Sequence, residues 1–542
     1  MHTWCPIAPT LQLPGEENSE MKRLTLNRRQ FLRRTALGLS ATAALQFSGC
    51  STTKRKGKDL PMKAEKTARP PNIVWIMADD LSWADLGCYG QEKIETPNID
   101  RMAREGMRFG SCYSGAPLCA PARSSLMQGL HQGHATVRNN FIGFERDGER
   151  IRYRHSLQPG DVTVADVLRK AGYATGQFGK WGLAVGDQYG QPNAMGFDQF
   201  FGYLNQRKAH NYYPEYLWQN RELIHYPGNA GHEKKSPNTY DDRGRIRPHG
   251  VDDPKNARYS FDEYTREMFT FVREHKDEPF FLYFPSTIPH GAFEVPELGR
   301  YTDRDWPTVQ HKVYAAMVTR LDTAVGTLLE LLKQLGIDDN TVVFVTSDNG
   351  YSHSKQDIEP SLEAFFQHAG PFRGKKGHLN QGGVRVPMIA RWPGHIPADR
   401  TSDHVWAFYD FMATAADIAG VDLPPNDGIS VLPTLLGNSA DQAVHEYLYW
   451  ESRDEQAARF DQWHAVRLAP DAPVEVYDAD NDPAQEHDLA PARPDLAGRA
   501  REIFAEAHEP TPYCPGPGES RTSWKARMEA DGVTLTNNVN TW

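Results

Sequence analysis

Two acidic pairs in the sequence carry side chains that could bind a metal ion. Asp79 and Asp80 directly follow one apolar, β-branched run, and Asp348 and Asn349 closely follow another. Hard cations such as Ca²⁺ and Mg²⁺ take six or more oxygen ligands, and neither pair has the histidine or cysteine partner that is typical of zinc. Such pairs are also common helix caps and turn formers. Taken alone, they leave both interpretations open.

A third segment, Cys119-Ala-Pro-Ala-Arg123, could supply a nucleophile. Read in isolation, Cys119 is a free thiol and Arg123 a surface charge, and a five-residue pattern of this kind also arises by chance. The segments around it decide between these interpretations.

With these surroundings, the chain resembles the formylglycine-dependent sulfatases of the arylsulfatase type, in the alkaline-phosphatase-like superfamily, and most closely the bacterial carbohydrate sulfatases. The resemblance extends from Pro71 to Leu489. Besides the Cys119 segment, its motifs are PNIVWIMADDLSWADLGCYG at 71–90, TPNIDRMAREGMRF at 96–109, GYATGQFGKWGL at 172–183, IPH at 288–290, VVFVTSDNG at 342–350, PFRGKKGHLNQGGVRVP at 371–387 and VYDADNDPAQEHDLA at 476–490. Their common order makes the resemblance far more specific than any single motif.

The resemblance implies a modified nucleophile. A formylglycine-generating enzyme would read the Cys-x-Pro-x-Arg stretch and oxidise Cys119 to formylglycine, whose aldehyde hydrates to a geminal diol. One hydroxyl, bound to a single calcium ion and so more easily deprotonated, would attack sulfur in line while the bond from sulfur to the substrate alcohol breaks and the alcohol leaves. The second hydroxyl then expels sulfate from the covalent sulfo-enzyme, a step that an ordinary serine could not perform.

The resemblance also implies a role for individual residues. Arg123 is expected to hold the diol, Lys180 and Lys376 to contact the sulfate oxygens, and His290 to touch the ester. His290 and Lys376 are the candidates for protonating the leaving oxygen. The expected calcium ligands are Asp79, Asp80, Asp348, Asn349 and residue 119.

Two positions depart from the family pattern. Many members have histidine at position 182, credited with deprotonating the second hydroxyl, whereas this chain has Gly182. His210, in the segment FFGYLNQRKAHNYYPEYLW at 200–218, is the hypothesised replacement, and His134 is the competing candidate. The second departure is Gln381, where glutamate is common.

Alternating strand and helix patterns must position these residues. Short apolar runs rich in β-branched and aromatic residues predict strands, and apolar residues at three- and four-residue spacing predict helices between them. The strands are predicted at 72–78, 174–178, 280–284 and 341–346, and the helices at 163–171 and 315–335. The alternation predicts an α/β fold with helices on both faces of a large central sheet, which the resemblance makes mixed and alkaline-phosphatase-like. A smaller C-terminal α+β subdomain is expected after it.

The N-terminal residues are expected to be a targeting signal rather than part of the folded domain. A basic stretch with Arg28 and Arg29, a weakly apolar run from Ala36 to Phe47, and Cys50 together resemble a twin-arginine signal that ends in a lipoprotein cleavage site. We therefore expect export by the twin-arginine pathway to the periplasm or to a membrane, with Cys50 available for a lipid anchor. Because a signal should begin near its start codon, Met21 is the expected initiator.

The expected organisation has four parts. Residues 1–50 are an N-terminal extension and signal, residues 51–70 a polar linker, residues 71–440 the catalytic sulfatase domain, and residues 441–542 the C-terminal subdomain and tail. If Cys50 is lipidated and Cys119 is modified, Cys88, Cys112 and Cys514 remain in the mature chain, and an odd number of cysteines excludes a dense disulfide framework although it allows one bridge. No CxxC spacing indicates a zinc site. The net charge of -10 argues against a nucleic-acid partner, so local cations must attract an anionic substrate.

The resemblance implies hydrolysis of sulfate monoesters. The GKWGL motif and the segment at 200–218 resemble those of bacterial sulfatases that act on carbohydrates, so a sulfated carbohydrate is the expected substrate, first of all galactose or N-acetylgalactosamine sulfates. Trp181, Tyr212, Tyr213 and Trp218 are candidates for stacking on sugar rings, or are packing residues. The segment 138–140 could reach sugar hydroxyls or a second sulfate, or be a solvated loop. A phosphonate or phosphodiester hydrolase of the same superfamily is one alternative function, and a non-catalytic lipoprotein that binds sulfated glycans is another.

Overall fold

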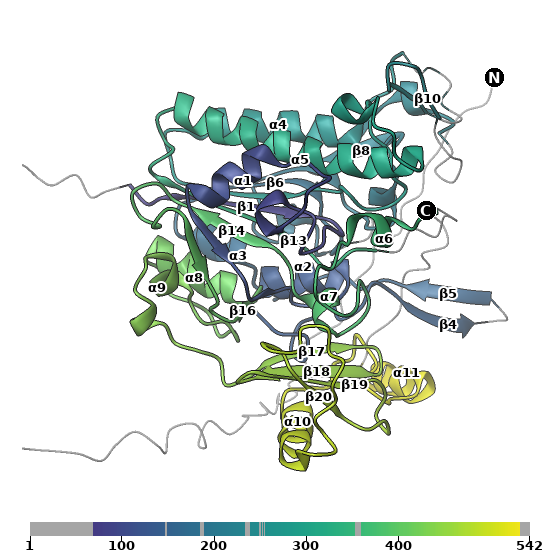
Figure 1. Ribbon diagram of the computed structural model, residues 1–542, viewed down its shortest axis with the longest axis vertical. Helices are drawn as coiled ribbons and strands as arrows, with labels where there is room; N and C mark the ends of the chain where they lie inside the picture. The colour runs from purple at the N-terminus through teal and green to yellow at the C-terminus, as the bar shows by residue number, and fades with distance from the viewer. Residues whose placement is uncertain are drawn as a thin grey trace, which may run out of the picture. The chain divides into compact units, whose positions relative to one another are not determined.

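The computed structural model describes residues 69–146, 149–184, 189–232, 239–248, 251, 253, 255–352 and 359–531. These residues belong to one compact unit, Thr67–Trp542, and most of its core strands lie in a mixed central sheet (Figure 1). The strands of this sheet, in spatial order, are β15 (Arg400–Ser402), β2 (Met107–Phe109), β14 (Met388–Arg391), β13 (Thr341–Ser347), β1 (Asn72–Ala78), β12 (Phe280–Pro285), β6 (Ala174–Lys180), β7 (Gln199–Tyr203), β8 (Tyr216–Gln219) and β9 (Glu222–His225).

The centre of the sheet is parallel. Strand β1 pairs with β13 on one side and β12 on the other, and β6 and β7 continue the parallel order beyond β12. Strands β14, β8 and β9 run antiparallel to their neighbours. The carboxyl ends of the parallel strands therefore meet at one edge of the sheet, which is where ligands bind in open α/β sheets.

Both faces of the sheet are covered by helices, as the alternation in the sequence predicts (Figure 1). Along β1, Val74 and Ile76 face one core while Ile73 and Trp75 face the other, because successive side chains of a strand point in opposite directions. The first core packs against α1 (Pro97–Arg104), α4 (Ser260–Glu274) and α5 (Val309–Gln334), and the second against α2 (Cys119–Gln128), α3 (Val164–Lys170) and α8 (Asp410–Ala419).

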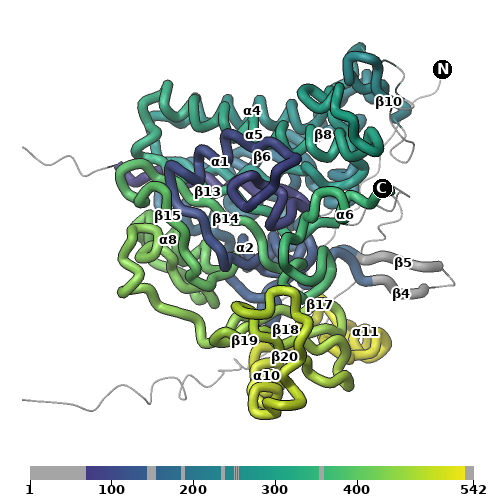
Figure 2. The backbone as a smooth tube through the Cα atoms, viewed as in Figure 1, coloured from purple at the N-terminus to yellow at the C-terminus, as the bar shows by residue number. Residues whose placement is uncertain are grey.

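A second, antiparallel sheet follows in the C-terminal part, and Figure 2 shows it beside the segments around α7 (Gln381–Val384), which Figure 1 labels. Its strands are β17 (Leu448–Ser452), β18 (Glu455–Phe460), β19 (Trp463–Arg467) and β20 (Glu475–Asp478). Helix α10 (Pro494–Glu506) packs on one face with its own core. On the other side, Trp450 contacts Tyr113 and its indole donates to the Ser114 carbonyl at 2.8 Å, which joins this sheet to the larger part.

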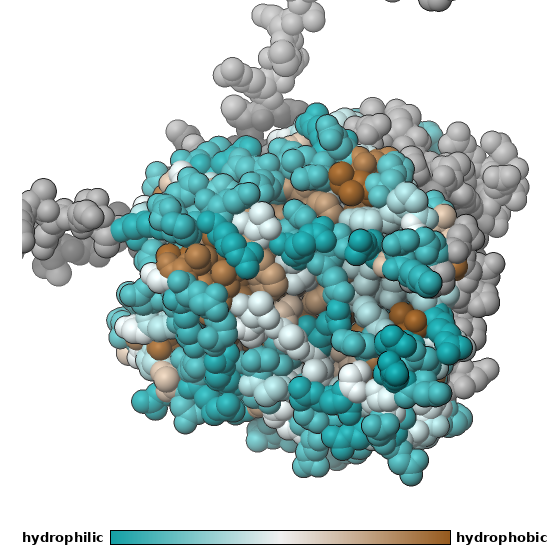
Figure 3. Space-filling view, turned by 90° about the horizontal axis from the view of Figure 1, so that it is seen from above, coloured by the Kyte–Doolittle hydropathy of each residue, from teal (hydrophilic) through white to brown (hydrophobic). Residues whose placement is uncertain are grey.

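The remaining elements are short. They are β3 (Cys112–Tyr113), β4 (Ile142–Arg146), β5 (Glu149–Tyr153), β10 (Thr239–Tyr240), β11 (Ile246–Arg247), β16 (Trp406–Ala407), α6 (Leu362–Phe366), α7 (Gln381–Val384), α9 (Leu432–Leu435) and α11 (Arg521–Ala530). The face in Figure 3 is mainly hydrophilic with separate apolar patches. Within the described ranges, no helix has the length and apolarity of a membrane span. The cysteines of those ranges, Cys88, Cys112, Cys119 and Cys514, are free thiols. The expected signal, Cys50 and the linker up to residue 68 lie outside the described residues.

Candidate active site

The register of the parallel strands brings the two acidic pairs together. Because Ala78 lies opposite Ser347, the residues that follow β1 and β13 leave the sheet side by side. The backbone N–H of Asp80 donates to Asp348 Oδ1 at 3.1 Å. Asp80 itself has a φ of +65°, an uncommon conformation for a residue other than glycine. Strain of this kind is typical of functional sites, where the surrounding structure holds it.

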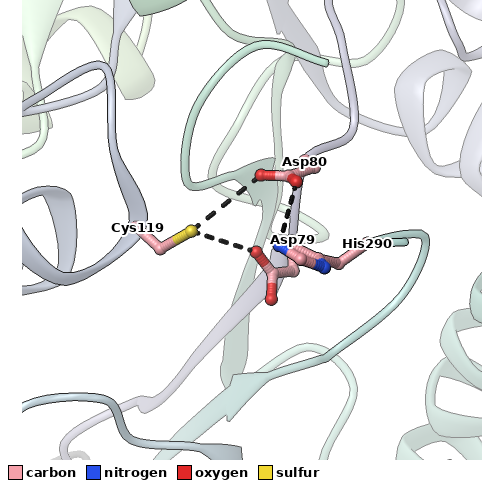
Figure 4. A group of neighbouring side chains, drawn as sticks. All are labelled: Asp79, Asp80, Cys119 and His290. Carbon is pink, nitrogen blue, oxygen red and sulfur yellow. Dashed lines mark hydrogen bonds and ion pairs between the residues drawn. The ribbon is translucent and has the colours of Figure 1, made fainter. Parts of the chain in front are cut away.

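Cys119 faces these carboxylates from the first residue of α2 (Figure 4). Its Sγ lies 3.4 Å from Asp79 Oδ1 and 3.9 Å from Asp80 Oδ1, and Lys376 Nζ lies 3.1 Å from Sγ. Burial raises the pKa of the Cys119 thiol, more than Lys180 and Lys376 lower it. An unmodified Cys119 is therefore a neutral thiol here, and a poor nucleophile.

Two buried cations, Arg123 and Lys180, and the partly exposed Lys376 pair with the three carboxylates. Arg123 donates through Nε and Nη2 to Asp348 Oδ2 at 3.2 and 2.8 Å. The other two pairs are Lys180 Nζ with Asp79 Oδ2 at 2.6 Å and Lys376 Nζ with Asp80 Oδ1 at 2.5 Å.

The pairing keeps Asp79 and Lys376 charged in this site. Burial raises the pKa of Asp79, but Lys180 and His290 lower it by a larger amount, so that the pKa lies below its ordinary value. Likewise, burial lowers the pKa of Lys376, but Asp80 raises it well above its ordinary value. Three positive and three negative charges thus balance one another around Cys119.

Two oxygens in this cluster have no hydrogen-bond donor. Asp80 Oδ2 and Asn349 Oδ1 are buried and accept no hydrogen bond from any residue that the structure describes, although Asn349 Nδ2 donates to Asp80 Oδ1 at 2.7 Å. A buried acceptor without a partner costs about 1–3 kcal/mol, which a bound cation removes. Candidate ligand atoms of Asp79, Asp80, Cys119 and His290 lie within 4.8 Å of one another. Because the orphaned atoms are carboxylate and amide oxygens, the residues fit a hard divalent cation.

His290 reaches the cluster from the loop after β12. Its Nε2 lies 3.3 Å from Asp80 Oδ2, and its Nδ1 lies 2.5 Å from the Gly291 carbonyl oxygen. Since a carbonyl only accepts, the Nδ1 proton points to Gly291. Burial lowers the pKa of His290, against the opposing effect of Asp80. The His210 ring stacks on the His290 ring with centroids 3.8 Å apart, so the structure places His210 at the site.

The backbone conformation at position 182 explains why glycine occupies it. Gly182 has a φ of +82°, in the left-handed region that favours glycine. A Cβ added there would lie 3.4 Å from Gln206 Oε1 and 3.7 Å from Arg123 Cδ. Gln206 is 4% exposed, and its Oε1 accepts no hydrogen bond. Sequence reasoning did not identify Gln206, because an isolated glutamine in a loop carries no signal.

His134 lies elsewhere, beyond the C-terminal end of α2. Its Nδ1 contacts the two carboxylate oxygens of Asp427 at 2.9 and 3.0 Å, and the tilted His131 ring lies with its centroid 4.1 Å from that of the His134 ring. These three residues are also close enough for a metal ion. However, His131 Nδ1 accepts a hydrogen bond from the Gly133 N–H at 3.1 Å, which places the ring proton of neutral His131 on Nε2. That tautomer disfavours a metal there.

Three of the candidate sugar-stacking residues are packing residues. Trp181 and Tyr212 are fully buried and Tyr213 is 3% exposed, while Trp218 on β8 is half-buried. The Tyr212 hydroxyl lies within hydrogen-bond distance of the carbonyl oxygens of Thr287 and His290, between which its single proton is shared, so it shapes the loop that carries His290.

Two further segments serve the structure of the site. Arg138 is 4% exposed and forms an ion pair with Glu451, so it reaches no substrate. Asn140 Oδ1 accepts from the Ala120 N–H at 3.0 Å instead of pointing to solvent. Gln381 receives hydrogen bonds from Arg385 and Tyr113 and donates to the Ala479 carbonyl. Its neutral amide thereby fixes the loop after Lys376 to the C-terminal part.

Comparison with known proteins gives a consistent family. The sulfatase family model matches residues 71–421, and a model for the C-terminal region of N-sulphoglucosamine sulphohydrolase matches residues 374–496. The chain is 32% identical to the N-acetylgalactosamine-6-sulfatase of Rattus norvegicus over 403 residues, which cover 72% of this chain and 70% of that protein. It is 31% identical to the arylsulfatase G of Mus musculus over 414 residues, which cover 72% and 73%.

A solved structure agrees with these relatives. The structure of Ps i-CgsB in complex with k-i-k-neocarrahexaose has a TM-score of 0.65 and 25% identity, and the match covers 86% of this chain and all of that one. The matched fold includes both the large mixed sheet and the small antiparallel one, which confirms the predicted fold class. The chain belongs to the sulfatase family and is a sulfuric ester hydrolase.

Proposed function

We propose that this sulfatase removes sulfate from carbohydrates, through a formylglycine formed from Cys119 and with a bound calcium ion. The observation that carries the proposal is the buried cluster around Cys119, in which three carboxylates face three cations and two oxygens lack a donor. Relatives that act on N-acetylgalactosamine sulfate or bind a carrageenan oligosaccharide support a sugar substrate, with galactose and N-acetylgalactosamine sulfates first.

Charge balance supports this chemistry. The six paired side chains of the cluster sum to zero, since Asp79, Asp80 and Asp348 offset Arg123, Lys180 and Lys376. A divalent cation would therefore leave an excess of two positive charges. A sulfate monoester brings one negative charge, and a deprotonated hydroxyl at position 119 brings a second. The loaded site would thus be neutral when both are present, in a buried environment where electrostatic stabilisation is strong.

Asp79, Asp80, Asp348, Asn349 and residue 119 would hold the cation, which lowers the pKa of a bound hydroxyl when present. Oxidation of Cys119 would supply the hydrated aldehyde, with one hydroxyl to attack sulfur and another to expel sulfate. Arg123 fixes Asp348 and also donates to the Lys180 carbonyl at 2.7 Å, which keeps the start of α2 beside the end of β6. Lys180 and Lys376 present ammonium groups to sulfate oxygens.

Of the two candidate proton donors, Lys376 fits the leaving oxygen better. Lys376 is held in its charged form by Asp80, and its Nζ already lies 3.1 Å from Cys119 Sγ. His290 directs its Nδ1 proton to the Gly291 carbonyl, so its Nε2 must first be protonated before it can donate. We therefore assign proton donation to Lys376 and orientation of the ester to His290.

His210 is the proposed base for the second half of the reaction. Its ring lies against His290, whereas His134 is engaged with Asp427 beyond the far end of α2. In His210→Ala, an initial burst of alcohol should be followed by slow sulfate release, because the second hydroxyl is deprotonated slowly. His134→Ala is the matched control and should release both products together. Equal rates of the two products in His210→Ala would remove His210 from this role.

The substrate class is tested by comparing esters. Protein co-expressed with the maturing enzyme should release sulfate from an aryl sulfate and from defined galactose and N-acetylgalactosamine sulfates. Turnover of phosphonate or phosphodiester esters at a higher kcat/KM would instead support a phosphohydrolase. Failure to release sulfate, together with binding of sulfated oligosaccharides, would support the non-catalytic binding protein.

We also propose export by the twin-arginine pathway, to the periplasm or to a membrane through a lipid at Cys50. The support is the paired Arg28-Arg29 and the apolar run before Cys50. Because this pathway carries folded proteins, formylglycine would be installed before export. Replacing both arginines with lysine should retain the protein in the cytoplasm. Unchanged export of that variant would contradict the proposal.

A further inference from the structure

The helix that begins with Cys119 lacks a cap from its own preceding residue. Leu118 occupies the N-cap position, and its side chain makes no capping hydrogen bond. Pro121 has no N–H, and the Ala122 N–H donates to the Leu118 carbonyl at 3.0 Å. The Ala120 N–H instead donates to Asn140 Oδ1 at 3.0 Å. A residue twenty positions downstream thus supplies the acceptor that N-cap side chains normally provide.

Asn140 is delivered by a segment that runs back along the helix. This return loop, residues 130–140, starts after α2 ends and reaches its beginning again. Gln132 Nε2 donates to the Pro121 carbonyl at 2.9 Å, and the Val137 N–H donates to Ser124 Oγ at 3.2 Å. The loop therefore follows the buried helix along its length and ends at the nucleophile.

The return loop is fastened to the C-terminal sheet. Arg138 Nη1 lies 3.1 Å from Glu451 Oε1 on β17 and donates to the Glu509 carbonyl at 2.8 Å. Glu451 is 4% exposed and is also contacted by the Tyr449 hydroxyl at 2.9 Å and by His508 Nδ1 at 2.7 Å. In addition, the Glu509 N–H donates to the Gly133 carbonyl at 3.1 Å. Both ends of the loop are thus held by residues from the C-terminal part.

We propose that Asn140 is a positioning residue for the nucleophile, and that Arg138 holds Asn140 in place from the C-terminal sheet. The proposal rests on the proposed function at Cys119. Asn140 touches the backbone directly after residue 119, so it fixes the direction from which the nucleophile meets the carboxylate cluster. Catalytic geometry tolerates only about 0.5 Å of displacement, and an error of about 1 Å costs on the order of a hundred-fold in rate.

Asn140→Ala removes the acceptor and should lower kcat about ten-fold with little change in KM, after correction for the formylglycine fraction measured by mass spectrometry. Asn140→Asp keeps an acceptor and should restore most of kcat, while its charge raises KM for an anionic substrate. Asn193→Ala, which removes backbone hydrogen bonds from a different loop, should keep both constants. A wild-type kcat in Asn140→Ala, or no rescue by Asn140→Asp, would overturn the proposal.

Hydrogen exchange separates this proposal from the proposed function. The Ala120 amide should exchange at least ten-fold faster in Asn140→Ala than in the wild type, whether or not the protein is a working sulfatase. Unchanged exchange would refute the cap. If exchange accelerates but fully converted wild-type protein releases no sulfate from any substrate, the proposed function fails instead.

A double-mutant cycle tests the part of Arg138. Arg138→Met should lower kcat in the same direction as Asn140→Ala, and the double variant should be no slower than the slower single variant, because both changes release the same contact. Multiplication of the two rate losses in the double variant would show that Arg138 acts independently of Asn140 and would refute the link to the C-terminal sheet.

Discussion

Replacing Asp80 with asparagine separates the metal site from the fold. The wild-type residue has a φ of +65°, and asparagine tolerates this left-handed conformation as well as aspartate does. The amide keeps an oxygen that can accept from Lys376 and Asn349. It replaces the orphaned Oδ2, the atom that most needs a cation, with an amide nitrogen that cannot bind one. We therefore expect Asp80→Asn to fold and to lose calcium binding.

The size of the effect follows from linkage. At a free calcium concentration of a hundred times Kd, binding stabilises the wild type by about 2.7 kcal/mol. For a folded unit the size of Thr67–Trp542, the entropy of unfolding is about 1 kcal/mol/K, so Tm should rise by about 3 °C. Loss of a residue that contacts a metal ligand, but not the metal itself, weakens metal affinity about 10- to 100-fold. Loss of a direct ligand such as Asp80 should therefore weaken calcium affinity by at least about 100-fold. At the same concentration, Asp80→Asn then gains only about 0.4 kcal/mol, or under about 1 °C.

The assay is a thermal-shift titration of chelator-treated protein with Ca²⁺, with metal content measured in parallel. Asp262→Asn, which breaks an ion pair with Arg320 on the surface, should show the full wild-type shift. An equal shift in Asp80→Asn and the wild type would refute the assignment of Asp80 as a ligand. No shift with Ca²⁺ in the wild type would refute the calcium site itself.

Three further substitutions test the surrounding geometry. Arg123→Lys keeps the positive charge but loses part of the paired hydrogen bonds that Nε and Nη2 donate to Asp348 in a fully buried site. Urea denaturation should show a free energy of unfolding lower by about 3 kcal/mol, and a decrease of under about 1 kcal/mol would contradict this role. In Gly182→Ala, the added Cβ meets no atom closer than 3.4 Å, but the left-handed backbone conformation is strained for alanine. Calorimetry should show a free energy of unfolding lower by about 1 kcal/mol, and an unchanged Tm would refute the strain. Burial lowers the pKa of His134, but the hydrogen bond to Asp427 and the nearby carboxylate charges together have the larger effect and raise the pKa above its ordinary value. Burial raises the pKa of Asp427, but His134 and His131 lower it by more, to below its ordinary value. The pair therefore stabilises the fold between the ordinary pKa values of 3.8 and 6.5, and its contribution fades as pH rises through the raised pKa of His134. His134→Gln should lose about 1 kcal/mol at pH 5.5 and much less at pH 8.5, and equal losses at both would contradict the charge pair.

The sheet could be predicted from the sequence because its strands are short apolar runs with clear ends. The strand predicted at 72–78 matches β1, and those predicted at 174–178, 280–284 and 341–346 each continue by one or two residues in the structure. Helix α5 begins at Val309, six residues before the prediction, because polar residues such as His311 interrupt the apolar pattern although His311 is buried. The residue type alone does not tell whether a histidine is buried with a hydrogen-bond partner or exposed to solvent.

The site was predictable in its residues but not in its contacts. Family motifs identify the carboxylates and cations, since each lies at the end of a strand, in the first turns of α2 or in the loop before α7. The one-to-one pairing of these charges depends on strand register, which the sequence does not contain. The cap from Asn140 depends on a loop that returns to its own helix, and nothing in the residues around it indicates this contact. The φ of Gly182 likewise became clear only from the backbone.

The most direct test of the formylglycine at position 119 relates turnover to modification. Preparations with different formylglycine fractions are obtained by varying co-expression of the maturing enzyme, and mass spectrometry of the Cys119 peptide gives each fraction. Sulfate release per molecule should rise in proportion to that fraction and reach zero when Cys119 is unmodified, as in Cys119→Ala. A rate that does not depend on the fraction, or that persists in fully unmodified protein, would contradict the account.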